Sequence, residues 1–210
     1  LVKHGYSRLD DIINESCIRA KHGESTDKPQ HVLIAPSWSD SGIIESGAGE
    51  EIIDTLIADD IRVTLRPHPQ TIKFAKDKIN SILKKYTNHK SFTYEDHVSG
   101  QDTLHDSDIM ISDWSGVAFD YAYGLGKPVI FIAVAKKVNN KDHEEICIQP
   151  IEISERSNIG QILNIEDIGN ILELVKTPPQ RPQRPQRPVF NLGNSSTVGA
   201  KEILRILDNP

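Results

Sequence analysis

The residues best suited to chemistry stand in two short polar stretches, each placed directly after a run of apolar residues. One of them, LRPHP (65–69), contains Arg66 and His68. Prolines bracket the histidine and restrict its backbone, and the guanidinium of Arg66 offers planar donors suited to phosphate oxygens. The stretch therefore indicates an anion contact beside a histidine able to donate a proton, although a lone histidine is more often structural or solvated than catalytic.

The second polar stretch, SDWSG (112–116), separates two almost purely apolar runs. Ser115 and Gly116 stand where the next helix should begin, and the unpaired backbone N–H groups at a helix start favour an anion. A hydroxyl beside a residue without a side chain would let a phosphate approach closely. The alternative is that Asp113 or Ser115 only caps the helix, as is common at such positions.

The spacing of apolar side chains predicts the elements that position these residues. Short apolar runs indicate strands, and segments of helical period lie between them. Strands are expected at 31–36, 61–67, 91–96, 109–112 and 127–134. Helices are expected at 49–60, 71–86, 101–108, 117–124, 164–176 and 195–207. Gly124 should end the fourth helix, Asn164 should cap the fifth, and Ser195 or Ser196 the last.

This alternation of strands and helices predicts an α/β fold with a Rossmann-like, doubly wound parallel sheet. The unrelieved apolar character of the strands agrees, because strands covered on both faces need not alternate. In such a sheet the loops after the strands meet at the carboxyl edge, where ligands bind beside a reversal of strand order. Arg66, His68 and SDWSG would therefore face one rim, together with PSWSDSG (36–42) and YEDH (94–97).

Composition and missing motifs exclude several function classes. The formal net charge of −6 argues against a nucleic-acid groove, which needs clustered Lys and Arg. There is no P-loop, GxGxxG or GxSxG motif, and the DSD stretch (106–108) precedes a strand, at the wrong edge for a metal site. We therefore expect no metal and no cofactor. Cys17 and Cys147 are far apart, and the sequence has neither a bilayer-length apolar run nor a signal peptide, so a cytoplasmic protein is expected.

The last part of the chain is organised differently. Residues 177–188 repeat Pro-Gln-Arg and should be extended, because each proline fixes φ and lacks an N–H. A semi-rigid linker is expected, and a ligand for an SH3-type domain is the alternative. We therefore divide the chain into a leading segment (1–30), an α/β domain (31–176), this linker and a C-terminal helix (189–210).

With these residues identified, the chain resembles the CDP-glycerol glycerophosphotransferase family, which contains teichoic-acid-type polymerases and primases of GT-B architecture. HGYSRLDDI (4–12) is similar to the family's GYPRxD segment, VLIAPSW (32–38) to its ILYAPTW, LRPHP to its Arg-His motif and YEDH to its nucleotide-contacting stretch. The longest match is SDIMISDWSGVAFDYAYGLGKPVIFI (107–132), which resembles SDxxISDYSSxxFDYxxxxKPIIFF. The resemblance implies the C-terminal, nucleotide-binding half of a GT-B fold, with residues 1–30 leading out of an N-terminal domain that is missing here.

The resemblance also implies a reaction, the transfer of a polyol phosphate from a CDP-linked polyol to a hydroxyl acceptor in the synthesis of a cell-surface polymer. His68 would be catalytic and meet the diphosphate. The donor would be bound by Arg66, Ser37, Trp38, Glu95, Asp113, Ser115 and Gly116. Gly116 stands where the family has a second serine, and Trp114 where it has a tyrosine, which leaves one phosphate-facing hydroxyl unaccounted for.

The rest of that reaction would depend on the missing N-terminal domain. It would supply the general base and the lipid-linked or polymeric acceptor, and it could associate peripherally with the inner face of the plasma membrane. This fragment alone should bind the donor without turning it over. Two alternatives stay open: a GT-B glycosyltransferase or UDP-sugar 2-epimerase domain that uses another nucleotide, and a non-catalytic domain that binds nucleotide or a protein partner.

Overall fold

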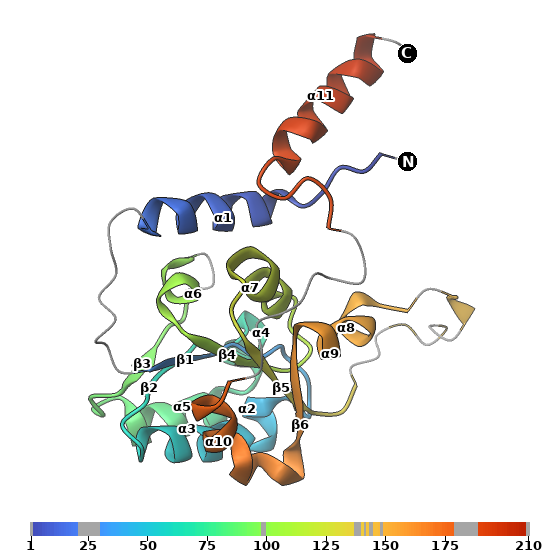
Figure 1. Cartoon of the computed structure of the whole chain (residues 1–210). Helices are drawn as coiled ribbons and strands as arrows, with labels where there is room; N and C mark the ends of the chain where they lie inside the picture. Colours follow the sequence, from blue (N-terminus) through green and yellow to red (C-terminus); the bar gives the residue numbers. More distant parts are fainter. Residues whose placement is uncertain are drawn as a thin grey trace.

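The chain folds around a six-stranded parallel sheet (Figure 1). The computed structural model describes residues 2–20, 30–97, 100–136, 140, 142, 145–147, 149–178 and 189–208. The strands are β1 (His31–Ile34), β2 (Arg62–Leu65), β3 (Phe92–Tyr94), β4 (Ile109–Ser112), β5 (Val129–Ala133) and β6 (Gly160–Asn164). Their order is β3-β2-β1-β4-β5-β6, and every neighbouring pair is parallel. The predicted α/β class and parallel sheet are confirmed.

Helices cover both faces of the sheet. They are α1 (Ser7–Ala20), α2 (Ile43–Ser46), α3 (Ala48–Ile57), α4 (Pro69–Phe74), α5 (Lys76–Tyr86), α6 (Asp102–Asp106), α7 (Val117–Leu125), α8 (Ile151–Ser154), α9 (Arg156–Ile159), a 3₁₀ helix (Ile165–Asn170), α10 (Ile171–Lys176) and α11 (Ser195–Asp208). Figure 1 places α1, α6 and α7 on one face and α2, α3, α5 and α10 on the other. Successive strand residues point to opposite faces, so Leu33 and Met110 join the core under α7, and Ile34 and Ile111 the core over α3.

The strand order reverses between β1 and β4. The chain builds β2 and β3 on one side of β1 and then crosses over, so that β4 pairs with the other side of β1. Connections that run in opposite directions from neighbouring strands leave a crevice at the carboxyl edge of a sheet. The LRPHP stretch follows β2 and the SDWSG stretch follows β4, so both lie at this edge.

Two predicted helices have different ends from those expected. The segment 71–86 is two helices, α4 and α5, separated at Ala75, whose φ of −114° and ψ of 41° are not helical. Helix α7 does not end at Gly124 but continues to Leu125, and Gly126 follows it in the left-handed conformation (φ 63°). Gly124 lies inside the helix because α1 packs there: a Cβ at this position would be 2.7 Å from Ile12 Cγ2.

The region after residue 150 also departs from the sequence prediction. Strand β6 was missed, and the expected helix 164–176 is a 3₁₀ helix followed by α10. Asn164 precedes the 3₁₀ helix without a side-chain capping bond, and its amide donates to Asp167 Oδ2 instead (3.1 Å). The predicted Pro-Gln-Arg linker falls almost entirely on 179–188, outside the described residues.

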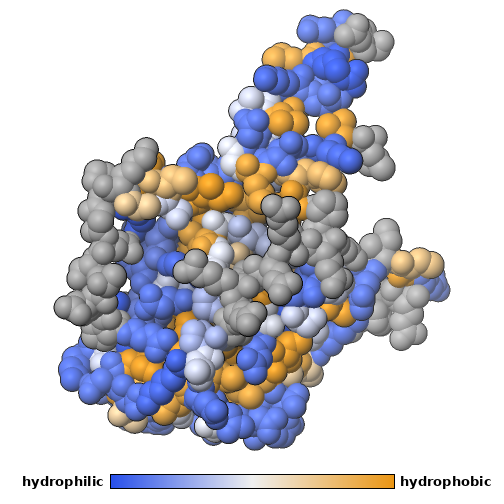
Figure 2. Space-filling model, viewed as in Figure 1, coloured by the Kyte–Doolittle hydropathy of each residue, from blue (hydrophilic) through white to orange (hydrophobic). Residues whose placement is uncertain are grey.

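Helix α11 is held at its start by a residue from α1. Asp10 accepts from the Ser196 N–H (2.9 Å) and from the Ser195 hydroxyl (2.8 Å), so the predicted serine cap is replaced by a carboxylate distant in sequence. Burial raises the pKa of Asp10, but these hydrogen bonds outweigh it and lower the pKa to about 2. Beyond this anchor α11 projects from the body (Figure 1), and hydrophobic residues, coloured orange, are visible along it in Figure 2.

Candidate functional site

A cavity of about 300 Å³ opens at the carboxyl edge of the sheet, beside the reversal of strand order. Its lining includes Arg66 and His68 from the stretch after β2, Ser115 from the stretch after β4, and Arg8 from α1. We call it the anion cavity. The structure thus brings together three residues that the sequence placed on one rim, and it adds a second guanidinium.

Arg66 is buried, with only 4 % of its surface exposed. Its Nη1 donates to the Gly100 carbonyl (3.3 Å) and lies 4.0 Å from Glu95 Oε1. Burial lowers the pKa of Arg66 and the Glu95 carboxylate opposes that change, and an arginine remains charged at neutral pH. Glu95, which also accepts from the Thr103 hydroxyl, therefore acts on Arg66 and is a positioning residue in this geometry.

His68 stands at the N-cap of α4, directly before Pro69 at the first helical position. Its Nδ1 accepts from the Gln70 N–H (3.1 Å). A ring nitrogen that accepts carries no proton, so this contact favours the neutral tautomer with the proton on Nε2. The exposed ring can therefore present an Nε2–H donor to a ligand oxygen while its backbone is fixed by the helix start and the two prolines.

Asp113 was predicted to contact a phosphate, but its side chain is not accessible to a ligand. Its side chain is fully buried, and Oδ1 accepts from the Ser37 N–H (2.6 Å) and the Trp114 N–H (2.6 Å). Burial raises the pKa of Asp113, and the hydrogen bonds from Ser37 and Trp114 oppose that shift. The carboxylate therefore ties the loop after β1 to the loop after β4, beneath the surface that a ligand would reach.

Ser115 and Gly116 form the start of α7, as the sequence predicted. No side chain among the described residues caps this helix, so neither Asp113 nor Ser115 has the capping role left open above. Gly116 is exposed, and a Cβ there would have nothing within 4 Å. An uncapped helix start with open space before it is a favourable place for an anion.

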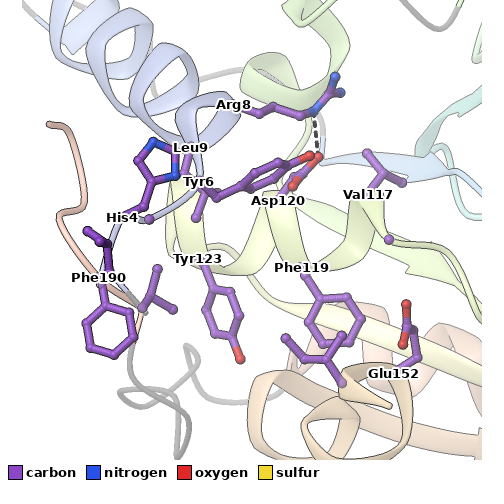
Figure 3. Close-up of a pocket in the computed structure, with 15 residues that line it drawn as sticks. His4, Tyr6, Arg8, Leu9, Val117, Phe119, Asp120, Tyr123, Glu152 and Phe190 are labelled. Atoms are coloured by element: carbon purple, nitrogen blue, oxygen red, sulfur yellow. Dashed lines mark hydrogen bonds and ion pairs between the residues drawn. The ribbon is translucent and has the colours of Figure 1, made fainter. Parts of the chain in front are cut away.

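Sequence reasoning missed Arg8 as a site residue. Its Nε donates to Asp120 Oδ2 on α7 (2.6 Å), an ion pair visible in Figure 3. Burial raises the pKa of Asp120, while Arg8 and Arg66 lower it. The pair joins α1 to α7 and holds the second guanidinium beside the anion cavity. The only signal in the sequence was the position of Arg8 within HGYSRLDDI.

Two further cavities adjoin the anion cavity. The larger one, about 870 Å³, shares Arg8 and Val117 with it and has aromatic walls (Figure 3). Its aromatic residues are Tyr6, Phe119, Tyr123 and Phe190. Gly116 also lines it.

The other, about 280 Å³, shares His68 with the anion cavity and is lined by Ser37, Trp38 and Trp114. We call it the tryptophan cavity. The predicted residues Ser37 and Trp38 thus line the cavity next to the one that Arg66 lines.

The DSD stretch has structural partners at the opposite, amino end of β4. Asp108 Oδ2 accepts from the His31 N–H (2.8 Å), and Asp106 Oδ1 accepts from Arg19 (3.0 Å). Within the described ranges, no group of three His, Cys, Asp or Glu residues is arranged to hold a metal ion. None of the helices in the described part of the chain combines the length and apolarity needed to cross a bilayer.

Comparison with known sequences identifies relatives over most of the chain. Residues 1–144 match the family model described as CDP-Glycerol:Poly(glycerophosphate) glycerophosphotransferase. The teichoic acid poly(glycerol phosphate) polymerase of Bacillus spizizenii is 27 % identical, in an alignment that covers 62 % of this chain and 34 % of the relative.

Solved structures resemble the whole fold. The UDP-GlcNAc 2-epimerase of Methanocaldococcus jannaschii, in complex with UDP-GlcNAc and UDP, matches with a TM-score of 0.62 and 16 % identity, over 99 % of this chain and 54 % of that one. A variant of the wall teichoic acid polymerase TagF matches with a TM-score of 0.54 and 18 % identity, over 99 % and 53 %. At such identities the likeness shows the fold, which is Rossmann-like and of GT-B type. The chain spans about half the length of these structures and about a third of the curated relative.

Proposed function

The chain belongs to the CDP-Glycerol:Poly(glycerophosphate) glycerophosphotransferase family, and from that premise we propose that it binds the CDP-polyol donor of a polyol-phosphate transferase. The observation that carries this proposal is the meeting of Arg66, His68 and Ser115 in one cavity at the reversal of strand order. A diphosphate is the part of such a donor that two guanidiniums and a helix start would hold.

The proposed reaction moves the polyol phosphate and releases CMP. The acceptor oxygen attacks the phosphorus that bears the polyol, the bond from this phosphorus to the bridging oxygen breaks, and the acceptor proton passes to a general base. Negative charge grows on the departing CMP. Donors already aimed at that charge supply most of the stabilisation in phosphoryl transfer. Arg8, Arg66 and the start of α7 have this role, and the Nε2–H of His68 hydrogen-bonds a phosphate oxygen.

We assign the remaining parts of the reaction to the portion of the longer relatives that this chain does not cover. They are the general base, the lipid-linked or polymeric acceptor site, and peripheral contact with the inner face of the plasma membrane. The polymerase soaked with CDPG has the same fold at a TM-score of 0.50 and 19 % identity, which supports a nucleotide-linked donor for this family. On this assignment, the isolated chain binds donor and does not turn it over.

Calorimetry with CDP, CMP and UDP tests the proposal. CDP should bind more tightly than CMP, because its second phosphate also reaches the cations of the anion cavity. Arg66→Gln should weaken CDP binding by about 10-fold or more, the worth of one charged hydrogen bond. The matched control is Lys73→Gln, which removes an exposed cation from α4, the helix that follows His68. A clear preference for UDP would discard the CDP-polyol donor in favour of a nucleotide-sugar enzyme of the same fold.

A further inference from the structure

The tryptophan cavity contains the only two tryptophans of the chain, Trp38 and Trp114. It lies next to the anion cavity, and His68 belongs to the lining of both. A molecule with a phosphate in the anion cavity could therefore extend its next few atoms past His68 into the tryptophan cavity. The question is which part of the donor would occupy the tryptophan cavity.

Trp114 is a fixed wall of this cavity. Its indole Nε1–H donates to the Val134 carbonyl (3.2 Å), and the guanidinium of Arg156 lies 4.1 Å from the ring centroid. Arg156 is itself buried, and it also lies 4.8 Å from the centroid of Phe131. A cation over an aromatic face is attracted to it, so the indole is held from two sides and cannot swing away when a ligand enters.

Polar side chains line the tryptophan cavity together with the two indoles. Lys136 supplies a donor and Glu152 an acceptor. Ser37 also lines the cavity, and its hydroxyl lies against the Asp113 carboxylate. A hydroxyl both donates and accepts, so a group with several hydroxyls could bind all three side chains. Its C–H groups would lie against the indoles, and this mixture of apolar walls and a few polar groups is usual for small-molecule sites.

The volumes of the two cavities indicate which end of the donor fits each of them. The tryptophan cavity, about 280 Å³, suits a short polyol, whereas the larger cavity, about 870 Å³, has room for a nucleoside. Each shares lining residues with the anion cavity, and Glu152 lines both of them. We propose that the tryptophan cavity binds the polyol arm of the donor and selects it. This inference rests on the proposed function, because it needs the diphosphate in the anion cavity.

The test compares CDP-glycerol with CDP, which lacks the polyol, by calorimetry and by tryptophan fluorescence. Because both tryptophans line this cavity, their emission should change with CDP-glycerol and with glycerol 3-phosphate, and less with CMP. Trp38→Leu and Lys136→Gln, which change residues that line the tryptophan cavity and not the larger one, should each lower the ratio of CDP-glycerol affinity to CDP affinity by about 3- to 10-fold, the worth of one contact. Affinity for CDP itself should stay within about twofold, because the diphosphate contacts are intact.

Phe74→Leu is the matched control for Trp38→Leu. Phe74 packs against Trp38 at a centroid distance of 5.6 Å, is 61 % exposed and is not part of the cavity lining. The affinity ratio should not change in this variant. An unchanged ratio in Trp38→Leu and Lys136→Gln, with CDP still bound, would overturn the polyol assignment and leave the proposed function standing. Emission that responds to CMP and not to glycerol 3-phosphate would overturn it in favour of the nucleobase. Failure of CDP to bind at all would remove both.

Discussion

Replacing Gly124 with alanine should push α1 away from α7 and move Arg8 out of the anion cavity. The new Cβ would lie 2.7 Å from Ile12 Cγ2 and 3.4 Å from Leu9 Cδ2. The first distance is about 1 Å shorter than an ordinary carbon–carbon contact. Ile12 is fully buried and cannot rotate into free space, so the helices must separate. Arg8 lies on the helix that would move.

The stability cost of this change follows from two opposing effects. Overpacking costs about 1–3 kcal/mol, and alanine in a helix is better than glycine by up to about 1 kcal/mol. We expect a net loss of about 1–2 kcal/mol. Separation of the helices also lengthens the 2.6 Å contact between Arg8 and Asp120. If the guanidinium no longer reaches a phosphate, one charged hydrogen bond worth about 1.5–3 kcal/mol is lost, and CDP binds about 10- to 150-fold more weakly.

Gly126→Ala separates the two consequences. Gly126 has a φ of 63° and nothing within 4 Å of its Cβ position, so the substitution costs about 1–2 kcal/mol of backbone strain without displacing α1. Denaturant unfolding gives the stability of both variants, and calorimetry gives their affinity for CDP. We expect similar stabilities and a loss of affinity in Gly124→Ala only. Wild-type affinity in a destabilised Gly124→Ala would refute the assignment of Arg8 to the site, and an equal loss in Gly126→Ala would show that affinity only follows stability.

Three other predictions follow from single contacts. In the proposed transferase, His68→Ala should lower turnover by about 100-fold or more, the usual effect of removing one donor that stabilises developing charge, with a near-native unfolding midpoint, whereas unchanged turnover would remove His68 from the mechanism. Asp113→Ala should lower the free energy of unfolding by about 2–4 kcal/mol, because the N–H groups of Ser37 and Trp114 lose their acceptor; a denaturation midpoint equal to wild type would contradict this. The pKa of Asp10 is depressed to about 2. Its contribution to the free energy of unfolding is therefore complete above the ordinary carboxyl pKa of about 3.9 and is lost as the pH falls toward 2. As the pH is lowered between these values, the melting temperature should therefore fall more steeply in the wild type than in Asp10→Asn. Parallel plots of melting temperature against pH would be inconsistent with the cap.

The sequence was sufficient to predict the sheet and the rim because both depend on local patterns. Buried strands such as β1 and β4 read as continuous apolar runs, and parallel topology then brings their carboxyl ends together. Strand β6 gave no such signal, since it is at the sheet edge and only Leu163 in it is buried. Apolar continuity therefore identifies inner strands and fails at edges.

The features of the site that the sequence could not predict depend on contacts between residues far apart in the chain. Arg8 reaches the site through a contact with Asp120, 112 residues away, and no local pattern encodes that packing. Gly124 has the residue type of a helix end, yet it serves the close approach of α1. Asp113 shows the same limit: a carboxylate in a polar loop looks the same in sequence whether it faces a ligand or lies fully buried beneath it.

A crystal structure of this chain soaked with CDP-glycerol tests the central claim most directly. The account predicts both phosphorus atoms in the anion cavity, with phosphate oxygens within hydrogen-bond distance of Arg66 and the His68 Nε2 and in front of Ser115 and Gly116. Density for the diphosphate elsewhere on the chain, with this cavity empty of ligand, would contradict it.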